Sequence, residues 1–362
     1  MSASLFSLSS QLRQVLDSYS SNIVLAYSSV KSRVLDRITS TEIFTSGRTD
    51  QAESIHHRLV SQIPIKPSYV APRNPIVLCH GLYGFDKLGP DFLPLLQVHY
   101  WKGIKEALED LGAKVIITGV SRTGEIRRRA QEIHSCLEVA AAGDRVNFIA
   151  HSMGGLDCRY LITHLRPKKY KVQSLTTLCT PHRGSPFMDW CRDQFGVGFV
   201  SLGEVAQEVY PDRMKRKHNL LKYLSPTNAK YPAGFHPDLG WISFLLDEPA
   251  YANLTTDYCR KYFNPNTPDS PDVAYFSYGA QAKAIPWMSP LWLTQGVIMS
   301  HEGDNDGLVS LESARWGKYI ETIEANHWDL NSRFRISTIG QTRFDAVDFF
   351  LRVATRLYHE GC

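Results

Sequence analysis

Ser152 has the surroundings that covalent chemistry requires. It lies in the segment "RVNFIAHSMGGLDCRY", where a mostly apolar run ends in Ala-His-Ser-Met-Gly and a helical pattern follows. A nucleophilic serine of this kind occupies a strained turn between a strand and a helix, and small residues are needed two positions before and after it because the two elements approach closely. Those positions hold Ala150 and Gly154. The segment therefore predicts that Ser152 is a nucleophile, with the methyl group of Ala150 as a modest steric demand.

A histidine must activate Ser152, because a serine hydroxyl is a weak nucleophile at neutral pH. In proteins with this turn the orienting acid follows the serine and the histidine follows the acid, so the base is expected late in the chain. Three late histidines are available, His301, His327 and His359. His359 ends the last expected helix, and an acid after His301 would have the wrong order. His327, between an expected strand and the last helix, is therefore the best candidate for the base.

The acid and the backbone donors come from short turn-like segments. The run "GDNDGLVS" offers Asp304 and Asp306, and either could be a solvated turn residue, which is the usual role of Asp beside Gly. A developing oxyanion needs two backbone N–H groups. One is expected from Met153, directly after the nucleophile, and the other from "LCHGLYGFD", where the chain turns after a strand and the N–H of Leu82 can donate.

Alternating strands and helices are expected to position these residues. Apolar runs predict strands at 76–79, 114–120, 145–150, 172–180 and 273–280, with a further strand at 317–323. Helical periodicity and terminal glycines predict helices at 101–112, 125–143, 155–165 and 342–360. Because the strands are apolar without polar alternation, they indicate a parallel sheet covered by helices on both faces. The expected fold class is α/β.

The regular alternation stops between Thr180 and about Pro271. This stretch is too long for a simple loop, so it is expected to be a helical insertion that forms a cap at about 185–270. Large apolar residues gather in it, including Phe195, Phe199 and Phe244. They either pack the insertion onto the sheet domain or form the apolar underside of a mobile cap.

The chain is expected to divide into an N-terminal extension at 1–70 and one folded domain at 71–362, joined by the Pro-rich segment "PIKPSYVAPRNP". Residues 1–40 are rich in Ser, basic and poor in acids, which is the pattern of a mitochondrial targeting segment. The alternative is an N-terminal extension that carries no targeting signal.

Composition excludes several classes of protein. The net charge is +4 without a long Lys/Arg block, so a dedicated nucleic-acid surface is not expected, although mild attraction to an anionic membrane remains open. No apolar run reaches the roughly 18 residues that span a bilayer, which predicts a soluble or peripherally bound protein. The seven cysteines show no C-x-x-C pair and are expected to be reduced, mostly buried thiols.

Several motifs together resemble the lipase family that joins bacterial true lipases to the fungal mitochondrial triacylglycerol lipase. They are "PIVLCHGLYGFD", "YWKGI", "VNFIAHSMGGLDCRY", "LCTPHRGSPFMDW", "FSYGA", and "NDGLV" followed 21 residues later by "NHWDL". The resemblance implies an α/β-hydrolase fold, a mostly parallel sheet with a helical cap. It also implies Ser152 as nucleophile, Asp306 as acid and His327 as base, with Leu82 and Met153 as oxyanion donors.

The resemblance further implies hydrolysis of acylglycerol esters (triacylglycerol, and diacylglycerol as a further candidate) at a lipid–water interface. A mitochondrial location follows from the N-terminus and from the family, with the cytoplasm or a lipid droplet as alternatives. A phospholipase, a thioesterase or an acyltransferase would use the same triad, and a non-catalytic lipid-binding protein is a further alternative. A secreted lipase is disfavoured, because no secretory signal is evident.

Neither an organic cofactor nor a metal is expected. Bacterial members of the family hold calcium with one Asp two residues after the catalytic His and another well before the catalytic Asp. Asp329 matches the first of these positions, but no Asp lies between Asp272 and Asp304 to match the second. A site with one carboxylate binds calcium weakly.

Overall fold

The computed structural model describes residues 69–84, 87–88, 98–101, 103–195, 205–209, 249–283, 285–287, 289–331 and 344–362. The expected N-terminal extension, apart from Tyr69 and Val70, and the middle of the expected cap lie outside these residues. The same holds for Phe199, Phe244 and the expected targeting segment.

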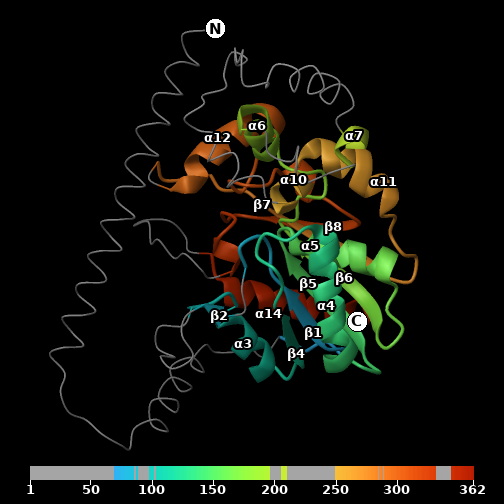
Figure 1. Ribbon diagram of the computed structural model, residues 1–362. Helices are drawn as coiled ribbons and strands as arrows, with labels where there is room; N and C mark the ends of the chain where they lie inside the picture. The colour runs from blue at the N-terminus through green and yellow to red at the C-terminus, as the bar shows by residue number, and fades with distance from the viewer. Residues whose placement is uncertain are drawn as a thin grey trace, which may run out of the picture. The chain divides into compact units, whose positions relative to one another are not determined.

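Six parallel strands form the central sheet (Figure 1). They are β1 (Ile76–Cys79), β4 (Val115–Thr118), β5 (Arg145–His151), β6 (Lys171–Leu178), β7 (Ala274–Ala280) and β8 (Lys318–Ile323), in the order β4-β1-β5-β6-β7-β8. Every pair of neighbouring strands is parallel. The prediction of a parallel α/β sheet is therefore confirmed, including its last strand, β8, which lies at one side of the sheet. A separate antiparallel pair joins β2 (Lys87–Leu88) and β3 (Val98–His99).

Helices cover both faces of the sheet, as the apolar strands require. The helices α3 (Ile104–Asp110) and α14 (Ala346–His359) contact each other on one face. The other face carries α4 (Ile126–Ala140), α5 (Gly154–Tyr160) and the π-helix η2 (Leu161–Leu165). Alternate residues of β1 enter the two cores, Ile76 and Leu78 on the α3 side, Val77 and Cys79 on the α4 side.

The strand order creates the place for a site. After β1 the chain adds β4 on one side and then crosses back to add β5 on the other. At such a reversal the loops after the two central strands separate, and a crevice opens at the carboxyl edge of the sheet. Here those loops follow β1 and β5, so the segment "HGLYG" and Ser152 lie beside each other.

The described elements between β6 and β7 are all helical. They are α6 (Pro186–Phe195), α7 (Val205–Val209), α10 (Pro249–Asn253), the π-helix η4 (Tyr258–Phe263) and α11 (Asn264–Asn266). Figure 1 shows them gathered, with α12 (Pro290–Glu302), at one end of the sheet. Met153, directly after Ser152, packs in one apolar cluster with side chains of these insertion helices. The end of the sheet that they cover is therefore the end where Ser152 lies.

Besides β8 and α14, three helical elements follow β7. These are α12, α13 (Leu311–Ala314) and the 3-10 turn η5 (Asp329–Asn331). The helix α12 was not expected from the sequence, because apolar residues are spread around all its sides and form no single stripe. Ile298 and Leu291 are buried, whereas Trp292 and Met299 are exposed.

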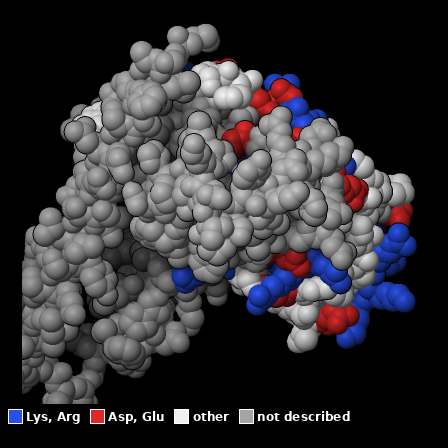
Figure 2. Space-filling view, turned by 45° about the horizontal axis from the view of Figure 1, so that its top comes forward, with Lys and Arg blue, Asp and Glu red and all other residues white. Residues whose placement is uncertain are grey.

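The described surface in Figure 2 carries basic and acidic side chains next to each other rather than a patch of one sign. Such interleaving agrees with the small net charge of the chain. Within the described ranges, the helices are too short or too polar to cross a bilayer.

Candidate active site

Ser152 lies on a strained turn between β5 and α5. Its φ is 56°, in the left-handed region that non-glycine residues seldom adopt. The turn is held on both sides, because the N–H of Ser152 donates to the carbonyl of Leu178 (2.9 Å) and Thr180 Oγ1 donates to the carbonyl of Ser152 (2.7 Å). Strain of this kind persists only where the neighbouring structure fixes it. The fold thus places the Ser152 side chain at the end of the sheet.

The positions around Ser152 differ in how small their side chains must be. A methyl group built on Gly154 would lie 2.8 Å from the carbonyl oxygen of His80, and one built on Gly155 would lie 2.2 Å from Thr180 Oγ1. These two positions therefore admit only glycine. Ala150 is fully buried in the apolar core on the α4 side of the sheet, which accommodates its methyl group. The extra methyl group at Ala150 is therefore compatible with the turn.

The loop after β1 touches Ser152. A methyl group built on Gly81 would lie 2.6 Å from Ser152 Cβ and 3.1 Å from Ser152 Oγ. Among the described residues, neither the N–H of Leu82 nor that of Met153 has a hydrogen-bond partner. Unpaired backbone N–H groups are rare in folded proteins, and Met153 is fully buried. One of these residues directly follows Ser152, and the other directly follows Gly81, which contacts Ser152.

Asp306 and His327 form a buried pair. His327 Nδ1 lies 2.7 Å from Asp306 Oδ2, and both side chains are shielded from solvent. The other carboxylate oxygen of Asp306 accepts the N–H groups of Leu308 (2.9 Å) and Val309 (2.8 Å). The N–H of His327 donates to the carbonyl of Asp306 at 2.9 Å. The carboxylate is thus fully oriented, and it fixes the ring of His327.

His151 joins the two halves of the site. Its ring centroid lies 4.6 Å from that of His327, and its Nδ1 is 2.7 Å from the hydroxyl of Tyr100. Burial and the nearby His327 ring hold the pKa of His151 well below its ordinary value, so this ring is neutral. Sequence reasoning did not single out His151 or Tyr100. The adjacency of His151 to Ser152 was the available signal.

The other sequence candidates lie elsewhere. Asp304, His301 and His359 are exposed, and the ring of His301 is 2.8 Å from a carbonyl within its own helix. Of the two acids that the turn "GDNDGLVS" offered, only Asp306 contacts His327.

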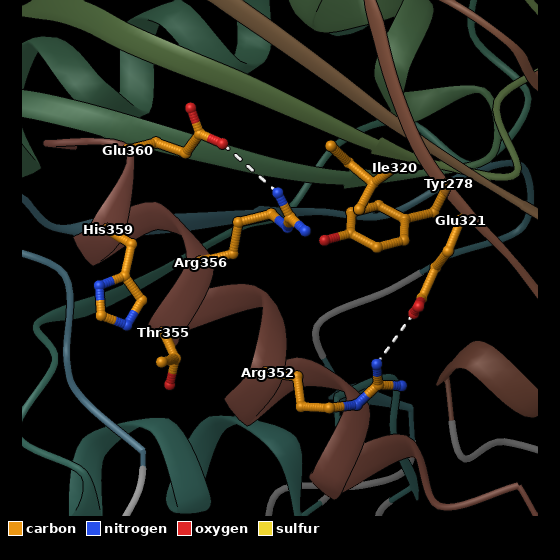
Figure 3. A pocket seen from close by; sticks show the side chains of 8 residues that line it. All are labelled: Tyr278, Ile320, Glu321, Arg352, Thr355, Arg356, His359 and Glu360. Atoms are coloured by element: carbon orange, nitrogen blue, oxygen red, sulfur yellow. Dashed lines mark hydrogen bonds and ion pairs between the residues drawn. The ribbon is translucent and has the colours of Figure 1, made fainter.

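A cavity of about 510 Å³ lies between α14, β7 and β8 (Figure 3). Its charged side chains are paired with each other, Arg352 with Glu321 and Arg356 with Glu360. Of the candidate residues only His359 lines it, whereas Ser152, Asp306 and His327 do not, so we assign it no part in the chemistry.

His182 in "TPHRG" is a structural residue. It is fully buried and stacks on Trp316. Its Nε2 lies 3.0 Å from Thr177 Oγ1, and Arg159 lies beside its Nδ1. Burial, with the charges of Arg159 and Arg183, holds the pKa of His182 well below its ordinary value.

A His182→Gln variant tests that neutral state. Below about pH 6.5 the unfolded chain binds a proton at His182 that the folded protein does not, so wild-type stability falls as the pH drops. The variant lacks this proton uptake. We expect the difference in unfolding free energy between wild type and variant to shrink by up to about 1.4 kcal/mol per pH unit below pH 6.5. Urea unfolding from about pH 7.5 to 5.5 measures it, and a constant difference would contradict the assignment.

Asp329, the residue that matched one calcium ligand, caps its own turn. Its Oδ2 accepts the N–H of Asn326 at 2.9 Å, and burial raises its pKa. The part of the chain that the structure describes contains no cluster of three or more His, Cys, Asp or Glu side chains that could hold a metal ion.

Comparison with known proteins gives consistent results. A family model described as "Putative serine esterase (DUF676)" matches residues 115–212. Triacylglycerol lipase 2 of Saccharomyces cerevisiae is 31% identical over 84% of this chain and 97% of its own length. A triacylglycerol lipase of Pseudomonas fragi is 36% identical over 81% of this chain and 98% of its own. The crystal structure of Staphylococcus hyicus lipase shares the fold, with a TM-score of 0.53 at 18% identity over 82% of this chain and 98% of that chain.

Proposed function

Because the chain belongs to the triacylglycerol lipase family of ester hydrolases, we propose that it hydrolyses acylglycerol esters with Ser152 as nucleophile, Asp306 as acid and His327 as base. One observation carries the proposal. Two unpaired N–H groups, of Leu82 and Met153, flank a serine on a strained turn. A donor pair of this kind is what a tetrahedral oxyanion requires.

The proposed reaction passes through an acyl-enzyme. Ser152 Oγ transfers its proton to His327 as it attacks the ester carbonyl, and the N–H groups of Leu82 and Met153 bind the oxyanion. The His327 imidazolium, which Asp306 orients and stabilises, then protonates the departing glycerol oxygen. The same histidine next activates the water that hydrolyses the acyl-enzyme.

An apolar cluster beside the donors supports a fatty-acyl substrate. Met153 belongs to this cluster, Leu82 packs against it, and the insertion helices contribute Met188, Val209 and Tyr251. An apolar wall next to the donors suits an acyl chain better than a polar leaving group. We propose that the insertion acts as a cap and that the enzyme works at a lipid surface.

Measuring fatty-acid release from several lipid classes tests the proposed substrate. Purified wild type and Ser152→Ala are incubated with emulsified tri-, di- and monoacylglycerol, with phospholipid and with acyl thioester, and the released fatty acid is measured. We expect release from acylglycerols by wild type alone. Preferred release from phospholipid or thioester, or transfer to an alcohol acceptor, would replace the proposal by one of the related activities. Absence of release from every class would leave a lipid-binding role.

We propose that the reaction needs no calcium. The support is that Asp329 is occupied as a turn cap and that no second Asp lies at the other ligand position. A chelator is therefore expected to leave the rate of fatty-acid release unchanged. Activity that is lost in chelator and returns when calcium is added would contradict this prediction.

A mitochondrial location is also proposed, from the Ser-rich and basic residues 1–40. Fusion of these residues to a fluorescent protein tests it. A diffuse cytosolic signal, or one on lipid droplets, would favour the other locations.

A further inference from the structure

The peptide between Gly81 and Leu82 is held by three donors. The carbonyl oxygen of Gly81 lies 3.0 Å from His80 Nδ1, 3.2 Å from the N–H of Gly84 and 3.3 Å from Nη2 of Arg129. A carbonyl oxygen usually accepts one or two hydrogen bonds, since it has two lone pairs. This oxygen is therefore fixed more firmly than an ordinary loop carbonyl.

The tautomer of His80 agrees with this arrangement. The N–H of Val120 donates to His80 Nε2 at 3.3 Å, so Nε2 is the acceptor nitrogen and the proton is on Nδ1. The Nδ1–H group can then donate to the carbonyl of Gly81.

Arg129 is the charged member of this set, and it is completely buried. Its Nε and Nη2 both lie 2.8 Å from Asp157 Oδ2, and Asp157 is also completely buried. The guanidinium further donates to the carbonyls of His80 (2.9 Å, from Nη2) and Ser121 (2.6 Å, from Nη1). Arg129 lies on α4, and Asp157 lies on α5, which begins directly after the nucleophile. The pair therefore joins the nucleophile helix to the loop after β1.

The geometry of a peptide bond carries the effect to the reacting atoms. A trans peptide is planar, and its C=O and N–H point in opposite directions. The carbonyl of Gly81 and the N–H of Leu82 belong to the same peptide. When Arg129 holds the carbonyl on its own side, the N–H of Leu82 must point to the other side. A cation on the carbonyl also polarises the peptide and strengthens its N–H as a donor.

We propose that Arg129, held by Asp157, is a positioning residue that orients and polarises the Gly81–Leu82 peptide as an oxyanion donor. The proposal rests on the proposed function, since it concerns the donor of that reaction. Arg129 touches no substrate and acts only through the peptide.

Arg129→Lys is the first test variant. A lysine keeps the charge but loses the planar fork, so it cannot bind Asp157 and both loop carbonyls in the same geometry. The assay uses a dissolved short-chain p-nitrophenyl ester, which avoids the lipid surface, together with its thiono analogue. Sulfur is larger than oxygen and a weaker hydrogen-bond acceptor, so a well-positioned donor favours the oxygen ester.

We expect kcat on the oxygen ester to fall by about 10²-fold with little change in KM, as for a modest misplacement of reacting groups. The preference for the oxygen ester over the thiono ester should fall as well. Asp157→Asn, which keeps the shape and removes the charge, should give a smaller loss of the same kind. If Arg129→Lys does not fold, the kcat and the ester preference of Asp157→Asn test the proposal instead.

Arg159→Lys is the matched control. Arg159 is also buried and lies on α5 with Asp157, but it binds Asn264 and the carbonyl of Thr267 rather than the Gly81 loop. It should lower the melting temperature without changing the preference for oxygen over sulfur. An unchanged kcat in Arg129→Lys, or an equal loss on both esters, would make Arg129 a packing residue only. If wild type cleaves neither ester, the proposed function itself fails.

Discussion

Replacement of Ser152 by alanine is expected to lower kcat for ester hydrolysis by about 10⁶-fold, as removal of the nucleophile does in serine hydrolases. The hydroxyl is the group that forms the acyl-enzyme, and the oxyanion donors alone supply only a small residual rate. Ser152 lies on the turn that the carbonyl of Leu178 and the hydroxyl of Thr180 stabilise through its backbone. Because these bonds do not involve the Ser152 side chain, the variant should keep its fold.

Initial rates of fatty-acid release and labelling by a fluorophosphonate probe measure the effect. The variant should lose both, while its melting temperature stays close to that of wild type. Ser300→Ala, which removes a hydroxyl from an exposed position on α12, is the matched control and should keep full activity. Labelling that survives in Ser152→Ala would mean that another residue is the nucleophile.

Replacement of His327 by alanine should cost a similar factor of about 10⁶ in kcat, because the serine then lacks its base. The loss should not add to that of Ser152→Ala. The double variant is expected to be no slower than either single variant, since both residues serve one proton transfer. Asp306→Asn should lose less, about 10⁴-fold, because the histidine remains but in the wrong tautomer.

His301→Ala and His359→Ala are the controls for the base. Both residues were open candidates in the sequence, and both are exposed. Their variants should keep the wild-type kcat. A large loss of kcat in either variant, with activity retained in His327→Ala, would mean that His327 is not the base. Rates of ester hydrolysis by the variants, measured up to alkaline pH, distinguish the loss of the general base from a lowered affinity for the ester.

Much of the site follows from local pattern. A strand that runs directly into Ala-His-Ser-Met-Gly and then into a helix makes the turn at Ser152 predictable, because backbone geometry and small neighbours are encoded within a few residues. The parallel sheet was predictable for the same reason, since apolar strands without alternation need cover on both faces. The choice of His327 as base followed from chain order, and the choice of Asp306 as acid followed from the "NDGLV" motif of the resemblance.

Other features could not be predicted because they depend on segments far apart in the chain. The helix α12 has apolar residues on every side and so carries no periodic signal. Arg129 follows Ile126 by three positions and shares its buried stripe on α4, which was a signal for a buried cation. Nothing local, however, indicates that its guanidinium meets a carbonyl 48 residues earlier.

The sequence by itself determined the nucleophile turn, the order of acid and base and the parallel sheet, because each depends on local geometry and spacing. The tertiary structure decided that Asp306 rather than Asp304 meets His327, and that His151 joins the serine turn to the base. It also decided that a buried Arg129–Asp157 pair holds the peptide of Leu82. These contacts exist only after distant loops meet at the carboxyl edge of the sheet, where burial leaves each polar group dependent on a partner from another segment.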